Sequence, residues 1–205
     1  MAPVYKLKFF DFMGVAEPIR YLFAYGGIKY ENIVINKEVD WPKIQRTVPF
    51  GKLPVLEIDS KVLHQSTAIC RYLGKVVGLL PSDDFFAAEL DALVASTFDF
   101  GARVHDWYHE ADVTCKAEVE RELETEVFPR YLNGFEEIIQ QKGGYLGGKQ
   151  LTWADFYFVG IIESVQGMWS RDFLQRYPYI TQLYKNVHAI PAVKNYIAGR
   201  PHYKY

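Results

Sequence analysis

Gln65 and Ser66 stand where HQSTAIC (64–70) passes from a short strand into a helix. The free backbone amides and the dipole at a helix start favour a carboxylate or phosphate group, and a serine hydroxyl adds one donor. A serine at this place also caps helices without binding any ligand. The residues alone leave both interpretations open, anion binding and capping.

A second feature lies just upstream, where Leu53 precedes Pro54 at the start of an expected strand. With a cis peptide bond, Leu53 could offer its backbone N–H and C=O to a peptide-like ligand. With a trans bond, Pro54 only begins an edge strand. Both alternatives fit the sequence.

The stretch KLKFFDFMGVAEPIR (6–20) reads as a strand, a loop and a helix, yet Phe9 and Phe10 at its turn carry no polar atom. A dithiol oxidoreductase needs Cys-x-x-Cys there, so disulfide exchange is excluded. Cys70 and Cys115 are far apart and fit no metal-binding spacing, which predicts packing or surface roles in a reduced protein.

The elements around these residues form two groups. The first group is expected to have the order β-α-β, loop, β-β-α, with a hairpin turn at Asp59-Ser60. This order predicts a thioredoxin-like α/β domain. Its expected elements are strand 4–10, helix 16–27, strand 30–36, loop 40–52, strands within 53–64 and helix 65–80.

From Phe85 onward only helical periodicity is present, which predicts an all-α domain. Thr152 and Asp155 have capping-box spacing before a run that is apolar on nearly every side, typical of a central buried helix. We therefore predict domains at 1–80 and 85–205 joined by a linker at 81–84. The expected helical stretches are 88–112, 116–144, 151–169 and 177–201.

The composition argues against several classes of function. The 205 residues are 49% hydrophobic and carry a net charge of −2, so nothing favours nucleic acid or an acidic membrane surface as a partner. No apolar run approaches the length of a membrane span, and no secretion signal is evident. These features favour a cytoplasmic globular protein. Aromatic residues at 16% fit core packing or an aromatic-lined ligand pocket.

Motifs spread over the whole chain resemble the sigma-class glutathione transferases, the group that includes insect sigma enzymes and haematopoietic prostaglandin D synthase. The resemblance implies a thioredoxin-like domain that binds glutathione, a helical domain that forms a hydrophobic substrate pocket, and a homodimer. The motifs are AEPIRYLFAYG (16–26), DWPKIQRTVPFGKLPVLEID (40–59), HQSTAICRYLGK (64–75), LTWADFYF (151–158) and IPAVKNYIAGRP (190–201).

The resemblance also implies roles for individual residues. Leu53, before Pro54, matches the residue whose backbone pairs with the cysteinyl unit of glutathione. The other matching positions are Trp41 and Lys52 for the glycyl end, Gln65 and Ser66 for the γ-glutamyl carboxylate, Asp99 for the γ-glutamyl amine across the dimer, and Phe12, Val15, Trp107 and Tyr108 for the hydrophobic substrate.

Three positions depart from the family pattern. Phe9 replaces the catalytic tyrosine, Val15 replaces an arginine of some members, and Gln45 replaces a lysine that helps hold the glycyl carboxylate. A thiol with a pKa of about 8.5 is only a few per cent thiolate at neutral pH. Losing a hydrogen bond to the charged sulfur costs about 1.5–3 kcal/mol, or roughly 10- to 100-fold in rate.

Substitute donors to the sulfur would be His105 or Tyr108, or backbone amides within 13–15. Tyr5 shares the strand face of Phe9 but lies about 13 Å away along the strand. Phe9 could also be an engineered replacement of tyrosine.

Two functions from different classes remain. The first is an enzyme, weakened by Phe9, that adds glutathione thiolate to a small hydrophobic electrophile, a peroxide or a prostaglandin endoperoxide. The second is a non-catalytic carrier or structural protein that still binds glutathione, for which the S-crystallins are the precedent. The sequence does not identify the second substrate.

Overall fold

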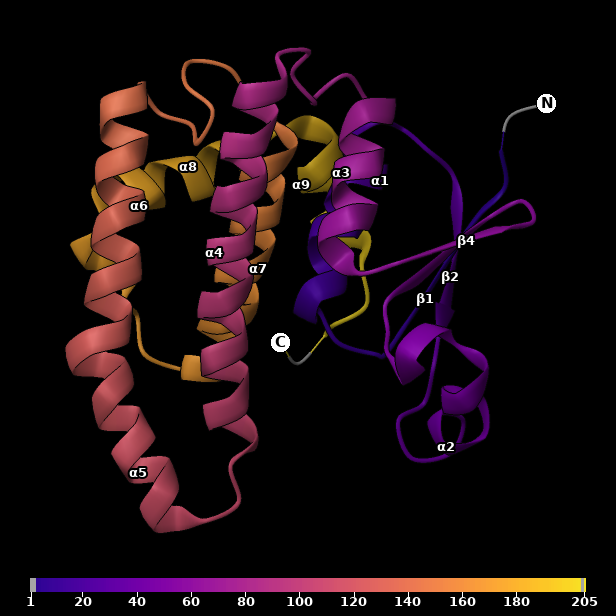
Figure 1. Cartoon of the computed structure of the whole chain (residues 1–205), viewed down its shortest axis with the longest axis horizontal. Helices are drawn as coiled ribbons and strands as arrows, with labels where there is room; N and C mark the ends of the chain where they lie inside the picture. The colour runs from indigo at the N-terminus through magenta and orange to yellow at the C-terminus, as the bar shows by residue number, and fades with distance from the viewer. Residues whose placement is uncertain (1–2, 204) are drawn as a thin grey trace.

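A computed structural model describes residues 3–203 and 205, and it has two layers of structure side by side (Figure 1). The N-terminal part contains a four-stranded mixed sheet in the order β2-β1-β3-β4. Strand β1 pairs in parallel with β2 and antiparallel with β3, which forms a hairpin with β4. The strands are β1 (Tyr5–Phe9), β2 (Tyr30–Val34), β3 (Val55–Ile58) and β4 (Lys61–His64).

Two helices lie between this sheet and the helical layer, α1 (Glu17–Tyr25) and α3 (Ser66–Val76) (Figure 1). Both pack against α7 (Trp153–Trp169) of the second layer. Strand β1 alternates buried and half-buried residues, and its buried Tyr5 packs against Phe23 of α1 with ring centroids 5.6 Å apart. The predicted thioredoxin-like domain is confirmed.

The C-terminal part is helical throughout its described elements. Helix α7 is buried along nearly its whole length, and Thr152 and Asp155 form the expected capping box at its start. The predicted all-α domain is confirmed, as is the central position of its apolar helix. The other helices are α4 (Asp84–His109), α5 (Val113–Glu122), α6 (Phe128–Lys142), α8 (Pro178–Ala189) and α9 (Pro191–Gly199).

Three local details differ from the sequence prediction. The loop predicted at 40–52 contains the short helix α2 (Trp41–Ile44) and two 3₁₀ turns. The helix predicted at 116–144 includes a π-helical segment, Leu123–Val127, between α5 and α6. Helix α4 begins at Asp84 because the Asp83 side chain accepts a hydrogen bond from the Phe86 amide. The last residue of the linker predicted at 81–84 therefore belongs to α4.

The structure also decides between the two alternatives for Leu53-Pro54 and describes both cysteines. The Leu53-Pro54 peptide bond is cis. Cys70 is buried in the core and Cys115 is exposed, and both are free thiols. Within residues 3–203 and 205, no helix has the length and apolar character needed to cross a membrane.

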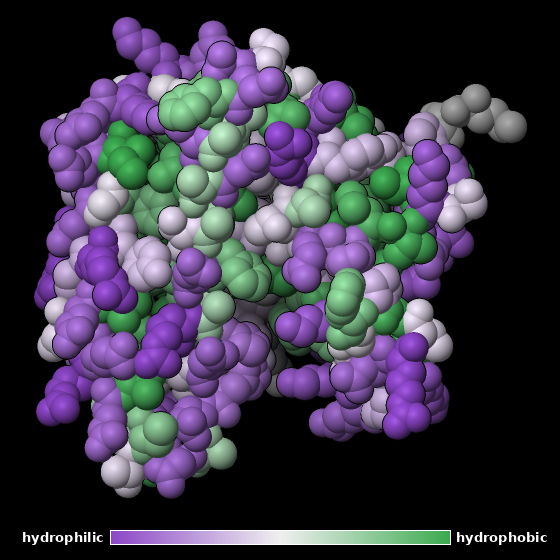
Figure 2. All heavy atoms as spheres, in the orientation of Figure 1, coloured by the Kyte–Doolittle hydropathy of each residue, from purple (hydrophilic) through white to green (hydrophobic). Residues whose placement is uncertain are grey.

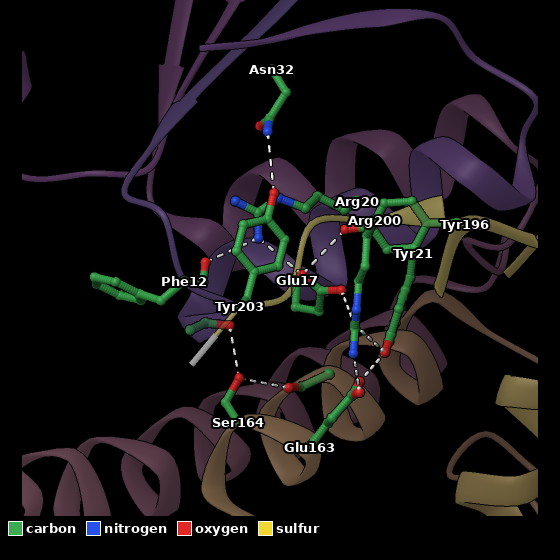
Figure 3. A network of polar contacts seen from close by, with 12 residues as sticks. Phe12, Glu17, Arg20, Tyr21, Asn32, Glu163, Ser164, Tyr196, Arg200 and Tyr203 are labelled. Carbon is green, nitrogen blue, oxygen red and sulfur yellow. Dashed lines mark hydrogen bonds and ion pairs between the residues drawn. The ribbon is translucent and has the colours of Figure 1, made fainter. Parts of the chain in front are cut away.

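A buried charge network joins the two domains (Figure 3). Glu17 of α1 accepts hydrogen bonds from Arg20 at 2.9 Å and from Arg200, which follows α9. Arg200 also donates to Glu163 of α7 at 2.6 Å. Tyr21 donates to the same Glu163 carboxylate. We call Glu17, Arg20, Tyr21, Glu163 and Arg200 the interdomain network.

The Glu163 carboxylate is held ionised by this network. Burial alone would raise its pKa, but hydrogen bonds from His188, Arg200 and Tyr21 outweigh burial and lower the pKa to about 2. Because the unfolded carboxyl group titrates near 4.5, the stabilising effect is complete above that pH. It is lost as the pH falls from there toward 2.

We expect Glu163→Gln to lower the free energy of unfolding by about 1.5–3 kcal/mol at pH 7, since a hydrogen bond to a charged group is lost. The difference in free energy of unfolding between Glu163→Gln and the unmodified protein should shrink between pH 4.5 and 3, where the stabilisation from the ionised Glu163 is progressively lost. Urea unfolding at several pH values measures both effects. The exposed Glu126 provides the control Glu126→Gln, and an equal loss in both variants would contradict the expectation.

Candidate functional site

A cavity of about 410 Å³ lies between the two domains. Figure 2 shows the surface hollowed between the lower parts of the two lobes. One wall of the cavity comes from the loop after β1, the Leu53-Pro54 segment and the start of α3, and the other comes from α4 and α7. The site is therefore formed jointly by both domains.

Phe9, the last residue of β1, lines this cavity and is only 4% exposed. Its ring packs against Phe12 with centroids 5.2 Å apart. The Arg20 guanidinium carbon lies 5.8 Å from the Phe9 ring centroid. The side chain at this position is thus fixed by packing, but it offers no hydrogen-bond donor.

The loop after Phe9 is held by hydrogen bonds with α1, α7 and the last residue of the chain (Figure 3). Arg20 donates to the Phe12 carbonyl at 3.1 Å, and Ser164 donates to the Gly14 carbonyl at 3.2 Å. The backbone N–H groups of Met13 and Gly14 both donate to the main-chain oxygen of Tyr205. Two of the backbone amides considered as substitute donors are therefore already engaged.

Five of the residues expected to bind glutathione lie together. Lys52, Leu53, Pro54, Gln65 and Ser66 all line the cavity that Phe9 lines. Gln65 has a φ of 70°, an uncommon backbone conformation for a residue other than glycine. Such strained residues cluster at functional sites.

The structure tests the capping interpretation of Ser66. The residue at the N-cap of α3 is Gln65, and no side chain makes a capping hydrogen bond there. Ser66 is instead the first residue of the helix, and its Oγ lies 3.1 Å from the hydroxyl of Tyr157 on α7. The capping interpretation is wrong for Ser66.

Three other expected binding residues lie outside the lining of this cavity. Trp41 packs edge-on against the cavity residue Phe10, with centroids 5.4 Å apart. Gln45 lies beside Gly51, the neighbour of Lys52. Asp99 is exposed on α4. Trp41 and Gln45 therefore flank the cavity, whereas Asp99 faces solvent in the single chain.

The hydrophobic pocket is only partly as expected. Phe12 and Val15 line the cavity, but Trp107 and Tyr108 do not. Helical periodicity explains this correction, because Phe100, Val104 and Trp107 form one buried stripe of α4 that faces the bundle core. The Trp107 ring packs on Trp169 at 4.5 Å, and the Tyr108 ring packs on Tyr205 at 4.8 Å.

Apart from His105, the sequence analysis did not identify the residues of α4 and α7 that face the cavity. On α4 this face consists of Phe98, Gly101, Ala102, His105 and Asp106. Their spacing follows the helical repeat, which could have identified them once one member was assigned. The four cavity residues of α7 are Ile161, Ser164, Val165 and Met168.

Of the side chains considered as substitute donors to the sulfur, only His105 lines the cavity, from an exposed position. Tyr5 is buried against Phe23, with ring centroids 5.6 Å apart. No cluster of three or more His, Cys, Asp or Glu side chains suited to a metal ion occurs in the described part of the chain. The cavity therefore joins an edge with polar residues to an apolar chamber.

Comparison with known proteins decides the family. Residues 5–75 match the model described as glutathione S-transferase, N-terminal domain, and residues 98–200 match its C-terminal domain. The chain belongs to the glutathione S-transferase family.

Individual glutathione S-transferase relatives agree over nearly the full length. Glutathione S-transferase S1 of Drosophila melanogaster is 36% identical over 96% of this chain and 79% of that protein. Human hematopoietic prostaglandin D synthase is 38% identical over 98% of this chain and 99% of that protein. The solved structure of prostaglandin synthase D of Nilaparvata lugens has a TM-score of 0.93 and 39% identity, covering 98% and 100% of the two chains.

Gly101 of this glutathione S-transferase allows α4 to pack closely against α7 within one wall of the cavity. A Cβ atom there would lie 2.7 Å from Cγ2 of Ile161. The helix runs straight through this position as part of Asp84–His109, so the glycine serves close packing and leaves α4 continuous.

We expect Gly101→Ala to lower the free energy of unfolding by about 1–3 kcal/mol, because the added methyl group overpacks the α4–α7 contact. The control is Gly134→Ala in α6, where a Cβ would meet nothing within 4 Å. That change should raise stability by about 0.5–1 kcal/mol. Urea unfolding measures both, and a stabilised Gly101→Ala variant would contradict the packing role.

Proposed function

We propose that this glutathione S-transferase, of the sigma class, adds the thiolate of glutathione to hydrophobic electrophiles. The observation that carries the proposal is the gathering of Lys52, Leu53, Gln65 and Ser66 along one edge of the cavity that Phe9 lines. A cation, a peptide backbone and two polar side chains are groups that can bind the carboxylates and peptide units of glutathione. The family match supports the same ligand.

The proposed binding mode assigns each edge residue one part of the peptide. Lys52, with Trp41 and Gln45 beside it, holds the glycyl carboxylate. The backbone of Leu53 pairs with the cysteinyl unit. Gln65 and Ser66 bind the γ-glutamyl carboxylate at the start of α3, where the helix dipole favours negative charge.

The second substrate occupies the apolar chamber between α4, α7 and the loop after β1. Phe12, Val15, Ile161 and Met168 supply its apolar surface, which suits a small hydrophobic electrophile. Relatives named prostaglandin D synthase make a prostaglandin endoperoxide one candidate, and organic peroxides are another. Each of these reactions uses the same thiolate.

A second candidate function is a non-catalytic protein that binds glutathione or hydrophobic ligands. Phe9 favours it, because the side chain expected to activate the sulfur has no hydroxyl group. Gln45 also favours it, because an uncharged amide replaces a cation at the glycyl end. The retained edge residues favour continued use of glutathione in either case.

We also propose a cytoplasmic homodimer. Phe50 and Phe98 are exposed by 83% and 40%, and both lie at the cavity. Association of two chains would cover such apolar side chains. It would also bring Asp99 of one chain toward the γ-glutamyl amine in the partner's site. Neither nucleic acid nor a membrane is proposed as a partner.

The Phe9→Tyr variant tests whether the site activates glutathione. We expect the pKa of the bound thiol to fall in Phe9→Tyr, because the new hydroxyl donates to the thiolate, and the conjugation rate to rise roughly 10- to 100-fold. Ultraviolet thiolate absorbance against pH, with glutathione bound, measures the pKa. Turnover of a chromogenic aryl halide gives the rate.

The unmodified protein decides between the two candidate functions. A bound-thiol pKa well below about 8.5 would mean that another donor replaces tyrosine and would support the enzyme. A pKa near that value together with no turnover would select the non-catalytic protein. Failure to bind glutathione in titration calorimetry would overturn the enzyme and the glutathione-binding form of the second candidate.

We expect Asp99→Asn to weaken glutathione binding about 10-fold while the protein stays dimeric, because a charge-assisted hydrogen bond across the interface is lost. Calorimetry gives the affinity and analytical ultracentrifugation gives the mass. A monomeric native protein, or unchanged affinity in the dimeric variant, would contradict this role for Asp99.

A further inference from the structure

Tyr157 makes a contact across the domain boundary at the proposed glutathione site. Its hydroxyl lies 3.1 Å from Oγ of Ser66. Tyr157 is fully buried on α7, and Ser66 is 3% exposed at the start of α3. Figure 1 shows these two helices in neighbouring layers. Only Ser66 of the pair lines the cavity.

The direction of this hydrogen bond matters for the ligand. A serine hydroxyl has one proton and two acceptor lone pairs. If Ser66 donates to Tyr157, no proton is left for a carboxylate in the cavity. If Tyr157 donates to Ser66, the serine proton is free to point at the ligand, and the two hydrogen bonds strengthen each other.

Burial keeps the phenol in its donor form. Desolvation raises the pKa of Tyr157 above its ordinary value, and the hydrogen bond with Ser66 opposes this only in part. The hydroxyl is therefore protonated throughout the physiological range. Since Ser66 makes no capping bond with α3, its hydroxyl orientation is set by Tyr157 and by the ligand.

We propose that Tyr157 is a positioning residue for glutathione, acting through Ser66 on the γ-glutamyl carboxylate. The proposal rests on the proposed function and deepens it. It makes a residue of the helical domain part of peptide recognition by the thioredoxin-like domain. The order of donors is Tyr157 hydroxyl, Ser66 hydroxyl, ligand carboxylate.

The test is Tyr157→Phe, which removes only the hydroxyl and keeps the ring packed. Calorimetry compares glutathione with an analogue in which 4-aminobutanoyl replaces the γ-glutamyl group, so that the α-carboxylate is absent. We expect the dissociation constant for glutathione to rise about three- to tenfold, with little change for the analogue. In turnover, KM for glutathione should rise while kcat at saturation is unchanged.

Two further variants complete the design. Tyr177→Phe removes the hydroxyl of another mostly buried tyrosine, 8% exposed, which lies outside the cavity lining. It should leave both dissociation constants unchanged. Combined with Ser66→Ala, Tyr157→Phe should add almost nothing to the loss of affinity, because both act through one hydrogen-bonded chain.

Each other outcome has a defined meaning. An equal loss for glutathione and the analogue would show that the hydroxyl supports only the fold, which overturns the inference. Unchanged glutathione affinity in Tyr157→Phe would overturn it as well. If the unmodified protein binds neither peptide, the proposed function itself fails.

Discussion

The buried network between Glu17, Arg20, Glu163 and Arg200 is the constraint on which the site depends. Charges in a dry interface are costly unless each is paired, so the domains can close in few arrangements. The pairs connect α1, α7 and the segment after α9 in one place. The cavity lies at the same domain junction, so its shape follows from where these charges meet.

The same network reaches the loop that borders Phe9. Arg20 pairs with Glu17 and also holds the Phe12 carbonyl, while Tyr203 stacks on the Arg20 guanidinium at 4.6 Å. The main-chain oxygen of Tyr205 accepts hydrogen bonds from two backbone N–H groups of the same loop. The hydrogen bonds that hold this loop therefore come from Arg20, Ser164 and the chain end, and none of them requires a hydroxyl group at position 9.

The sequence predicted most of the fold because its signals were local. Strand alternation, the capping box before α7 and the turn at Asp59-Ser60 depend on near neighbours in the chain. The cavity was less predictable because it depends on which face of α4 meets α7. Trp107 was assigned to the pocket from the resemblance to the family. In the structure it continues the buried stripe of Phe100 and Val104 on α4, which faces the core. Tyr157 lay inside an apolar run whose period suggested only burial, and its pairing with Ser66 spans 91 residues.

The proposed binding of glutathione and the activation of its sulfur rest on separate parts of this structure. The residues proposed to bind the peptide are Lys52, Leu53, Gln65 and Ser66, and none of them requires a hydroxyl at position 9. Activation would have relied on one donor whose loss costs about 1.5–3 kcal/mol. Holding two reactants in a defined geometry can supply about 7–11 kcal/mol, which is several times larger. A site that still positions thiol and electrophile could therefore retain most of its rate enhancement, and Phe9 alone does not require an inert protein.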